Sequence, residues 1–356
     1  MAAAQGYTNC PHCHRPLIEI DHYGERLIAG VHISPSKAPT VKEASSDWLE
    51  ASEALGLERA TIKVYSDHVR LHIVPFIGHL KLSDLSVQVV RKFEDTLRQN
   101  GRSAGLISMI VRSLGGILAD AQERGNSAHN AVKEMHRTRG KRRNKATQKR
   151  KLEIGVDIPA KEEVSSIIAH AKRQWRPLLL TAAFTGLRVS ELRGLRWSDV
   201  DLKANELKVR QRADRYNNID KPKSEAGERT VPFGPYLSNT LKEWKLACPK
   251  GELVFPNGQG KVENLSNIIT RGLVPAVTAA LGKPKYTGMH VFRHFYASWC
   301  IDRGQPPKVI QERLGHSSIT MTFDRYGHLF PRVDDSDEIE AAELAVVNAT
   351  QTRHAG

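Results

Sequence analysis

The sequence predicts a mainly α-helical fold in two parts: an all-helical domain, then an α+β domain that adds a small antiparallel β-sheet to its helices. Three observations predict this. Apolar residues recur at helical spacing between residues 41 and 135, two later segments alternate as short strands do, and a run of basic residues separates the two parts. A chain of 356 residues is long enough for two or three domains, each with its own core.

The charge balance points to a polyanionic partner. A hydrophobic share of 40% and a charged share of 26% are ordinary for a globular protein, but the net charge of +14 is not. Because the basic residues are clustered, nucleic acid is a better interpretation than a merely solvated basic surface.

The sequence shows no export or membrane signal. Residues 1–6 lack a basic leader and an apolar core, and no stretch approaches eighteen consecutive apolar residues. Four cysteines in this length do not make a disulfide framework. We therefore expect a cytoplasmic protein without a transmembrane helix.

Residues 1–40 form a separate N-terminal arm. Cys10 and Cys13 have the Cys-x-x-Cys spacing of half of a structural zinc site. Followed by His14, they also match a haem-attachment pattern, which no export signal supports. The second cysteine pair of a zinc ribbon is absent, so a small arm without metal is the alternative. The candidates for further zinc ligands are His12, His14, His22 and His32.

Residues 41–135 form the all-helical domain. Four apolar stripes at helical spacing predict four amphipathic helices joined by short turns. We expect Pro75 and Gly78 to break the second stripe, and Asn100 with Gly101 to end the third. Nothing in this domain has the residue pattern of a catalytic site.

Residues 136–157 form a basic linker. No acidic residue occurs between residues 137 and 151, and mutual repulsion keeps such a run extended. A solvated linker is the alternative, but a strap along DNA phosphates better fits this position between two domains. The predicted DNA-binding residues are Arg137, Arg139, Lys141, Arg142, Arg143, Lys145, Lys149, Arg150 and Lys151.

Residues 158–330 form the α+β domain, and its first part is helical. Pro159 and the acidic residues after it predict a helix start. The helical pattern continues through Trp175 to Phe184, and a second helix includes Leu192.

Two short strands then predict the small antiparallel sheet. Residues 206–210 and 229–233 alternate in polarity, and the polar segment between them contains Lys223. Several helices follow. Residues 331–356 form an acidic tail with the pattern of an amphipathic helix that could dock on a neighbouring molecule, although a frayed end fits equally.

Four residues near the end of this domain have the side chains of metal-free phosphodiester chemistry: His290, Arg293, His316 and Tyr326. Two imidazoles, a guanidinium and a phenol can grip a phosphate, move protons and attack phosphorus. If they converge in space, the chain is an enzyme acting on a phosphodiester. If they do not, it is a basic binding protein.

The order of the motifs resembles the tyrosine recombinase (phage integrase) family over roughly residues 175–330. TGLRVSEL at 185–192 is followed by LRWSDV at 195–200, Lys223, HVFRH at 290–294, LGH at 314–316 and Tyr326. All six catalytic positions of the family hold the expected residue types. Phe292 stands where the family often has leucine, which concerns packing. The helical domain would then be the family's core-binding, DNA-contacting domain.

The resemblance implies that Tyr326 attacks a DNA phosphodiester. This reaction gives a 3′-phosphotyrosyl link and a free 5′-hydroxyl. Arg188 and Arg293 would hold the two non-bridging oxygens, since a guanidinium matches that pair. Tyr286 and Tyr296 are rivals for the nucleophile by residue type, but only Tyr326 follows His316 by ten residues as in the family.

The resemblance also implies the proton donors. Lys223 would protonate the leaving 5′-oxygen, with Lys221 as its neighbouring rival. His290 and His316 would hydrogen-bond the phosphoryl oxygens and assist proton transfer. Glu191, one helical turn from Arg188, would brace the site.

Cations around a tyrosine stabilise its anion. A free phenol has a pKa near 10, so we expect the arginines and histidines to favour the Tyr326 phenolate. The sequence has no carboxylate cluster for a catalytic metal and no Gly-rich phosphate loop, and a phosphotyrosyl ester can be rejoined without ATP. We therefore expect catalysis without a cofactor.

The predicted function is a site-specific DNA recombinase, the integrase of a mobile element. We expect a homotetramer on two DNA sites that exchanges strands through a Holliday junction, with accessory DNA-bending or directionality proteins as further partners. A Xer-like resolvase of chromosome or plasmid dimers is the alternative within this fold. A type IB topoisomerase-like nicking-closing enzyme and a non-catalytic DNA-binding protein are the alternatives from other classes.

Overall fold

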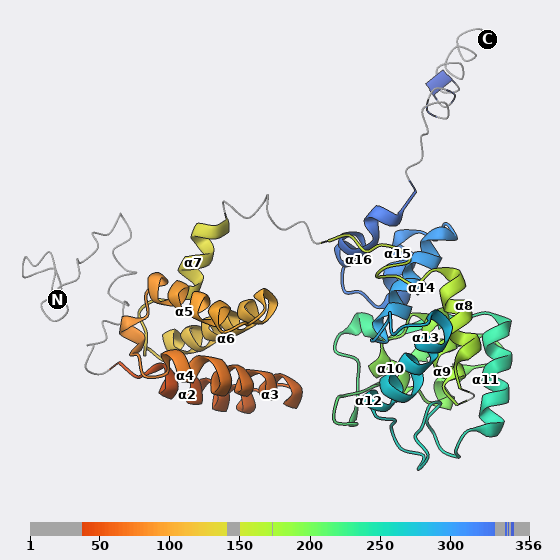
Figure 1. Ribbon diagram of the computed structural model, residues 1–356, viewed down its shortest axis with the longest axis horizontal. Coiled ribbons are helices and arrows are strands. Elements are labelled where there is room, and N and C mark those ends of the chain that lie inside the picture. The colour runs from red at the N-terminus through yellow and green to blue at the C-terminus, as the bar shows by residue number, and fades with distance from the viewer. Residues whose placement is uncertain are drawn as a thin grey trace, which may run out of the picture. The chain divides into compact units, whose positions relative to one another are not determined.

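The computed structural model describes residues 38–140, 150–172 and 174–331, together with the helical residues 339, 341, 343 and 344. The chain forms two compact units, Met1–Gln148 and Lys149–Gly356. In Figure 1 the described part of the first unit is all-helical, and that of the second adds short strands to its helices. The predicted fold class is confirmed.

The first unit is built around one central helix, α6 (Ala104–Glu123), which packs against α2, α3, α5 and α7. By length and composition alone α6 could cross a membrane, but Ile110, Leu114 and Ile117 are among its residues in the hydrophobic core, so it is a core helix. The other elements are α2 (Val41–Ala54), α3 (Arg59–His68), η2 (Val69–Ile73), α4 (Val74–Ile77), η3 (Leu82–Asp84), α5 (Val87–Gln99) and α7 (Ala131–Gly140).

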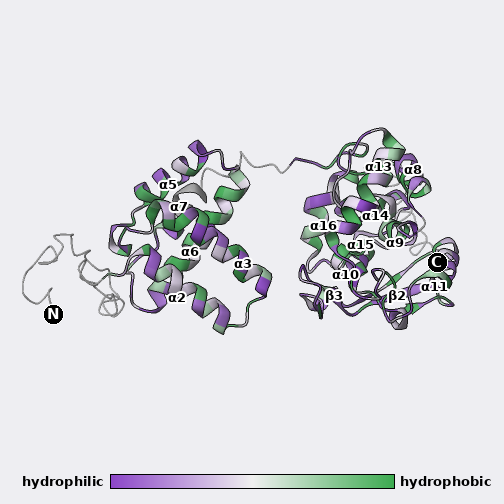
Figure 2. Ribbon diagram, turned by 60° about the horizontal axis from the view of Figure 1, so that its bottom comes forward, coloured by the Kyte–Doolittle hydropathy of each residue, from purple (hydrophilic) through white to green (hydrophobic). Residues whose placement is uncertain are grey.

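Side-chain caps determine where several of these helices begin. The Thr40 hydroxyl accepts a hydrogen bond from the Glu43 backbone N–H at 3.2 Å, and the Glu43 carboxylate accepts one from the Thr40 backbone N–H at 2.8 Å. Serines cap α5 and α6. Hydrophilic and hydrophobic residues alternate along α5 in Figure 2, and the buried apolar residues are Val90, Phe93 and Leu97.

Pro75 does not break the second helix, contrary to the prediction. α3, η2 and α4 continue through it because a π-turn precedes the proline, in which the Val74 amide donates to the Val69 carbonyl. In a regular α-helix a proline ring collides with the carbonyl four residues before it, and the wider π-turn moves that carbonyl away. The same arrangement precedes Pro275 in the second unit, at η7 (Ile268–Leu273).

α7 extends beyond the predicted end of the helical domain and adds a fifth helix to the four expected. Its residues 136–140 had been placed in the extended linker. Asn130 accepts hydrogen bonds from the Val132 and Lys133 backbone amides at 3.1 Å and donates to the Gly115 carbonyl of α6 at 2.9 Å. This cap and the packing on α6 stabilise the start of the helix.

The second unit contains the remaining elements. They are α8 (Lys161–His170), α9 (Arg176–Thr185), α10 (Val189–Gly194), η5 (Trp197–Asp199), β1 (Val200–Asp201), β2 (Glu206–Val209), β3 (Arg212–Ala213), β4 (Ile219–Asp220), η6 (Glu225–Gly227), β5 (Arg229–Pro232), α11 (Pro235–Ala247), α12 (Leu265–Asn267), η7, α13 (Val274–Leu281), α14 (His290–Asp302), α15 (Pro307–Leu314), α16 (Ile319–Tyr326) and η8 (Gly327–Leu329).

The two predicted strands are β2 and β5, and they pair antiparallel as expected. They belong to a three-stranded sheet in the order β1-β2-β5, with Leu207 opposite Val231, and both of these side chains are buried. β3 and β4 form a separate two-stranded ribbon. The segment that contains Lys223 connects this ribbon to β5.

The helix predicted to run through Trp175 to Phe184 is interrupted. α8 ends at His170, Ala171 is extended with ψ of 132°, and α9 starts at Arg176. Pro177, in the first turn of α9, explains the break, because a proline is tolerated in the first turn but disrupts a helix that runs through it.

Candidate active site

Helix α14 brings the predicted site residues together. It contributes His290 and Arg293, and it packs against α9 and α15. Arg188 lies in the turn between α9 and α10, His316 follows the glycine that ends α15, and Tyr326 is the last residue of α16, which packs on α15. The contacts described below connect these five residues into one cluster of the second unit.

Arg188 is held at the start of α10. Its Nη1 donates to Glu191 Oε1 at 2.8 Å, its backbone N–H donates to Glu191 Oε2 at 2.8 Å, and its Nη2 donates to the Gly315 carbonyl at 3.1 Å. The side chain is 37% exposed. A guanidinium in this position is fixed at one edge and open to an incoming phosphate at the other.

Glu191 braces the site, as the sequence suggested, and its main partner is Arg229. Two guanidinium N–H groups of Arg229 donate to the two Glu191 oxygens, at 2.9 and 3.2 Å. Burial alone raises the pKa of Glu191, but the hydrogen bonds and charge of Arg229, with the charge of Arg188, lower it overall. The carboxylate is therefore ionised.

Arg229 was not predicted as part of the site, although the sequence pattern of β5 included it. Its Nε donates to the Arg313 carbonyl at 2.7 Å and its Nη1 to the Gly227 carbonyl at 3.0 Å. It thus ties β5 and η6 to the end of α15. The signal in the sequence was an arginine in a strand, which cannot be distinguished from a surface residue without the fold.

Arg293 is buried, with 2% of its surface exposed. Its Nη1 donates to the Gly186 carbonyl at 2.8 Å, and its Nη2 donates to the Leu314 carbonyl. Both carbonyls lie at helix C-termini, where a positive charge is favoured. Burial, and then the charge of Arg188, lower the pKa of Arg293 to about 9, so the guanidinium stays charged at neutral pH.

Two glycines permit this close packing. Gly186 and Gly315 both have φ of +62° and end α9 and α15. A Cβ on Gly186 would lie 2.5 Å from Tyr296 Cδ1, and one on Gly315 would lie 2.7 Å from the Ala226 carbonyl oxygen of η6. The glycines of the two sequence motifs therefore let the arginines reach the backbone between helices.

The two predicted histidines are held as neutral imidazoles. His316 Nδ1 lies 2.9 Å from Thr322 Oγ1, and burial and then the charge of Arg293 lower the His316 pKa to about 3. His290 is exposed at the surface, yet the protein around it and the charge of Arg293 lower its pKa to about 4. At neutral pH each ring has one N–H to donate.

Tyr326 hydrogen-bonds to a residue that the prediction omitted. Its Oη lies 2.8 Å from His294 Nδ1, and Tyr326 is 1% exposed. Burial raises the pKa of Tyr326 to about 12, although Arg293 and Arg325 act to lower it. The arginine charges therefore favour the phenolate, as expected, but burial outweighs them and the net shift of the Tyr326 pKa is upward.

Lys223 lies on a different segment of the chain from the other five residues. It is exposed, in the segment between β4 and η6. That segment is held against the site by η6, whose Ala226 carbonyl faces Gly315, and by Arg229. The structure thus positions the segment that contains Lys223 beside the cluster.

Sequence patterns of two known domains match this chain. The phage integrase family matches residues 160–332, and the phage integrase N-terminal SAM-like domain matches residues 40–98. The two matches cover more than half of the chain. The chain belongs to the tyrosine recombinase (phage integrase) family. It is a site-specific DNA recombinase.

Curated relatives come from two branches of this family. The tyrosine recombinase XerC-like protein of Caldanaerobacter subterraneus subsp. tengcongensis is 27% identical over 82% of this chain and 80% of that protein. The prophage integrase IntR of Escherichia coli is 24% identical over 77% of this chain and 70% of that protein. The tyrosine recombinase XerC of Xylella fastidiosa is 33% identical, but over only 43% of this chain and 48% of that protein.

Solved structures share the fold of this recombinase. The Tn1549 transposon integrase, in complex with a circular intermediate DNA, has a TM-score of 0.69 at 18% identity, covering 86% of this chain and 100% of that chain. A lambda integrase dimer bound to a core site has a TM-score of 0.60 at 20% identity, covering 79% of this chain and 97% of that chain. These identities are low, so the likeness establishes the common fold.

The predicted DNA strap of this recombinase falls largely outside the described residues. Arg137 and Arg139 belong to α7, and Lys151 is exposed. Arg150 is also exposed and lies 3.2 Å from Asp157, an ion pair too solvated to hold it strongly. The residues outside the described part are Lys141, Arg142, Arg143, Lys145 and Lys149.

The predicted metal site also lies outside the described residues, since Cys10 and Cys13 belong to the N-terminal arm. Within the described residues, no group of three or more His, Cys, Asp or Glu side chains could hold a metal ion. Most of the acidic tail after Pro331 lies outside the described part as well.

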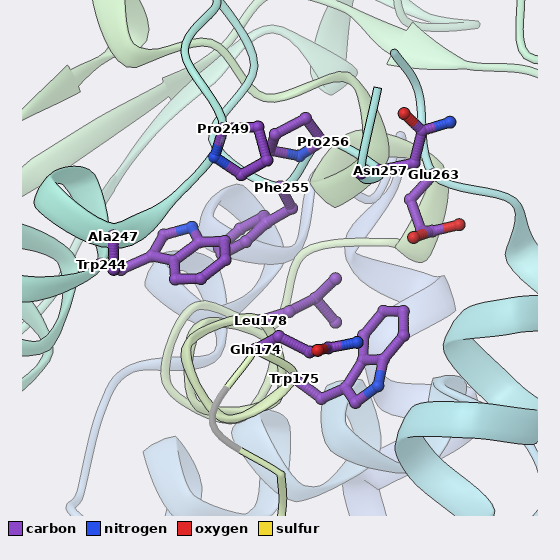
Figure 3. Close-up of a pocket in the computed structure, with 11 residues that line it drawn as sticks. Gln174, Trp175, Leu178, Trp244, Ala247, Pro249, Phe255, Pro256, Asn257 and Glu263 are labelled. Atoms are coloured by element: carbon purple, nitrogen blue, oxygen red, sulfur yellow. The ribbon is translucent and has the colours of Figure 1, made fainter. Parts of the chain in front are cut away.

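A pocket of about 470 Å³ lies elsewhere in the second unit (Figure 3). Trp175, Trp244 and Phe255 line it, and Glu263 is its one charged lining residue among those described. The Glu263 carboxylate already accepts hydrogen bonds from Asn264 and Asn267. The described residues that line the pocket include no cationic side chain and no residue of the cluster around Tyr326.

Proposed function

We propose that this recombinase is the integrase of a mobile element and that Tyr326 is its nucleophile. The observation that carries the proposal is the position of Tyr326, buried beside Arg293 and hydrogen-bonded within the same chain. One chain therefore supplies both the phenol and the guanidinium groups that an attack on phosphorus needs.

The contacts of the cluster support the following cleavage step. The scissile phosphate binds between Arg188 and Arg293, whose free N–H groups take its non-bridging oxygens. His316, with its Nδ1 at Thr322, presents its Nε2 to the same phosphate, and His290 donates from α14. The Tyr326 Oη then attacks phosphorus and forms a 3′-phosphotyrosyl ester while the 5′-oxygen leaves.

Lys223 is proposed as the acid for the leaving oxygen. A DNA 5′-alkoxide is a poor leaving group until it is protonated, and an ammonium on the exposed segment before η6 can approach the DNA backbone directly. Since the ester bond to Tyr326 preserves the energy of the cleaved phosphodiester, the strands rejoin without ATP. The fixed guanidinium charges take the place of catalytic metal ions.

The binding partner is double-stranded DNA, held by the basic residues 137–151. We propose a homotetramer on two DNA sites, with accessory DNA-bending or directionality proteins, in the cytoplasm.

The tail after Pro331 is proposed to dock on a neighbouring protomer, and its deletion should then weaken tetramer assembly. A structural zinc at Cys10 and Cys13 is proposed for the arm, and the zinc content of a Cys10→Ser variant compared with wild type tests it.

A test of the chemistry starts from DNA selected for this protein. A duplex is selected from a random-sequence library by its binding to Tyr326→Phe, and is then nicked near the cleavage point so that a short strand escapes. Without metal or ATP, wild type should form a covalent adduct that Tyr326→Phe does not form. An adduct that persists in Tyr326→Phe would remove Tyr326 as the nucleophile.

The same assay separates the alternative functions. A scrambled duplex that forms adduct as fast as the selected one would favour a type IB topoisomerase-like enzyme, and no adduct with any duplex would favour a non-catalytic DNA-binding protein. A Xer-like resolvase is the second candidate, supported by the 27% identical XerC-like relative. A resolvase recombines two copies of one site, whereas an integrase joins two different sites.

A further inference from the structure

The contact between His294 and Tyr326 is a second functional feature of the cluster. His294 Nδ1 lies 2.8 Å from Tyr326 Oη, and the two side chains are 8% and 1% exposed. Burial, and then the charge of His290, lower the pKa of His294 to about 3, while the pKa of Tyr326 is raised to about 12. At neutral pH both groups are uncharged, and in the tautomer of His294 that carries its hydrogen on Nε2 the phenol donates its hydrogen to Nδ1.

His294 lies on α14, the helix that also carries Arg293. It follows Arg293 on α14, and its ring lies against that of His290 with a centroid distance of 4.6 Å and an interplanar angle of 89°. The Tyr326 ring packs on His294 from α16, at a centroid distance of 5.8 Å. α14 thus carries both Arg293 and the imidazole nitrogen that contacts Tyr326 Oη.

We propose that His294 is the general base of DNA cleavage, its Nδ1 taking the phenolic proton as Tyr326 Oη bonds to phosphorus. This inference rests on the proposed function, because it needs Tyr326 as the nucleophile. In the step, the Oη–P bond forms, the P–O5′ bond breaks, the proton of Oη passes to Nδ1, and the leaving O5′ takes a proton from Lys223. In rejoining, the 5′-hydroxyl attacks phosphorus and gives its proton back to Lys223, the P–Oη bond breaks, and His294 returns the proton to Oη.

A weakly basic imidazole is sufficient for this role. As Oη forms its bond to phosphorus it loses electron density, so its proton becomes far more acidic than that of a free phenol. The base must then be neutral, in contact with Oη, and equipped with a free lone pair, and His294 has all three properties. The negative charge of a bound phosphodiester also offsets the repulsion that Arg293 and Arg325 exert on an imidazolium.

The neighbouring histidines differ from His294 in what they contact. His316 Nδ1 is already occupied by Thr322, and His290 meets His294 ring to ring. His294 is the histidine whose nitrogen meets the attacking oxygen itself. Of these three histidines, His294 is therefore the one whose contact suits it to act on the nucleophile.

The experiment compares three variants with wild type in single-turnover cleavage of the selected nicked duplex. His294→Asn places an amide oxygen near the position of Nδ1, so it keeps a hydrogen-bond acceptor but cannot take a proton. His294→Phe removes the acceptor and keeps a ring. His294→Ala opens space for imidazole added to the solution. Circular dichroism and non-covalent binding of the duplex check that each variant is folded.

We expect His294→Asn and His294→Phe to cleave about 10²- to 10⁴-fold more slowly than wild type, the usual contribution of a general base. We expect imidazole to restore part of the rate of His294→Ala, and each variant to rejoin more slowly as well. If His294→Asn cleaves within threefold of wild type, or if imidazole fails to restore a slow His294→Ala, His294 is not the base.

A faster His294→Phe would also overturn the proposal, because the hydrogen bond would then restrain Tyr326 instead of activating it. These results are distinguishable from failure of the proposed function. If the proposed function is wrong, wild type itself forms no Tyr326-dependent adduct. If only this inference fails, wild type forms the adduct and His294→Asn forms it equally fast.

Discussion

Arg229 and Glu191 form a buried ion pair in which two guanidinium N–H groups meet two carboxylate oxygens, at 2.9 and 3.2 Å. Their side chains are only 6% and 3% exposed. Glu191 also accepts hydrogen bonds from Arg188, and Arg229 also donates to the Arg313 carbonyl. The pair therefore connects Arg188 to α15, the helix before His316.

Removing one partner of this pair should lower the free energy of unfolding. Arg229→Met leaves a buried carboxylate with Arg188 as its remaining cation, and we expect the free energy of unfolding to fall by about 3–5 kcal/mol. Urea denaturation measures the change. The double variant Arg229→Met with Glu191→Met should lose less than the sum of the two single variants, since it leaves no unpaired charge. A loss below about 1 kcal/mol for Arg229→Met would contradict the prediction.

Arg293→Lys should be far from conservative. The Arg293 guanidinium spans the Gly186 and Leu314 carbonyls, and a single ammonium cannot bond both and still hold a phosphate oxygen. We expect adduct formation to slow by about 10²-fold or more, in the range measured when a preorganised donor is removed. Arg98→Lys, a change at an exposed arginine of α5, is the matched control and should cleave as wild type does. Equal rates for the two variants would exclude a special role of Arg293.

Stability should fall as the solution is acidified through the histidine range. The pKa values of His290, His294 and His316 are lowered from 6.5 to about 4, 3 and 3. Below pH 6.5 the unfolded chain binds protons that the folded site excludes, so the stability present above pH 6.5 is lost progressively as the pH falls toward 3 to 4. The measurement is urea denaturation at pH 7, 6 and 5.

His316→Asn isolates one contribution to this pH dependence. Asparagine does not titrate, so the plot of unfolding free energy against pH should be shallower for the variant than for wild type. The slopes of the two plots should differ by at most about 1.4 kcal/mol per pH unit, the limit for one excluded proton. Parallel plots for the two proteins would show that His316 is not held neutral by the fold.

Gly186→Ala should disrupt the site by sterics alone. Its φ of +62° is unfavourable for alanine, and the new Cβ would meet Tyr296 Cδ1 at 2.5 Å. The left-handed conformation alone costs about 1–2 kcal/mol, and we expect a larger total loss in unfolding free energy. Gly105→Ala, at a helical position of α6 with nothing within 4 Å, is the control and should leave stability unchanged or increase it. Similar losses for both variants would contradict the steric explanation.

Local patterns predicted much of the fold, and their failures share one physical cause. The spacing of apolar residues predicted the helices, and alternation predicted β2 and β5, because both depend on neighbours in sequence. Pro75 and Trp175 were predicted wrongly. A π-turn absorbs the first proline, whereas Pro177 stops the helix that Trp175 was expected to continue. Which outcome a proline produces depends on the packing around it.

The sequence by itself determined the family, the fold class and the order of the candidate site residues, because these depend on short motifs and their spacing. Tertiary structure decided the rest. His294 meets Tyr326 across 32 residues of chain and Arg229 meets Glu191 across 38, so neither contact follows from local pattern. The fold also decided the direction in which the Tyr326 pKa shifts, since the loss of water around a buried phenol outweighs the cations beside it, and burial arises only when distant helices pack together.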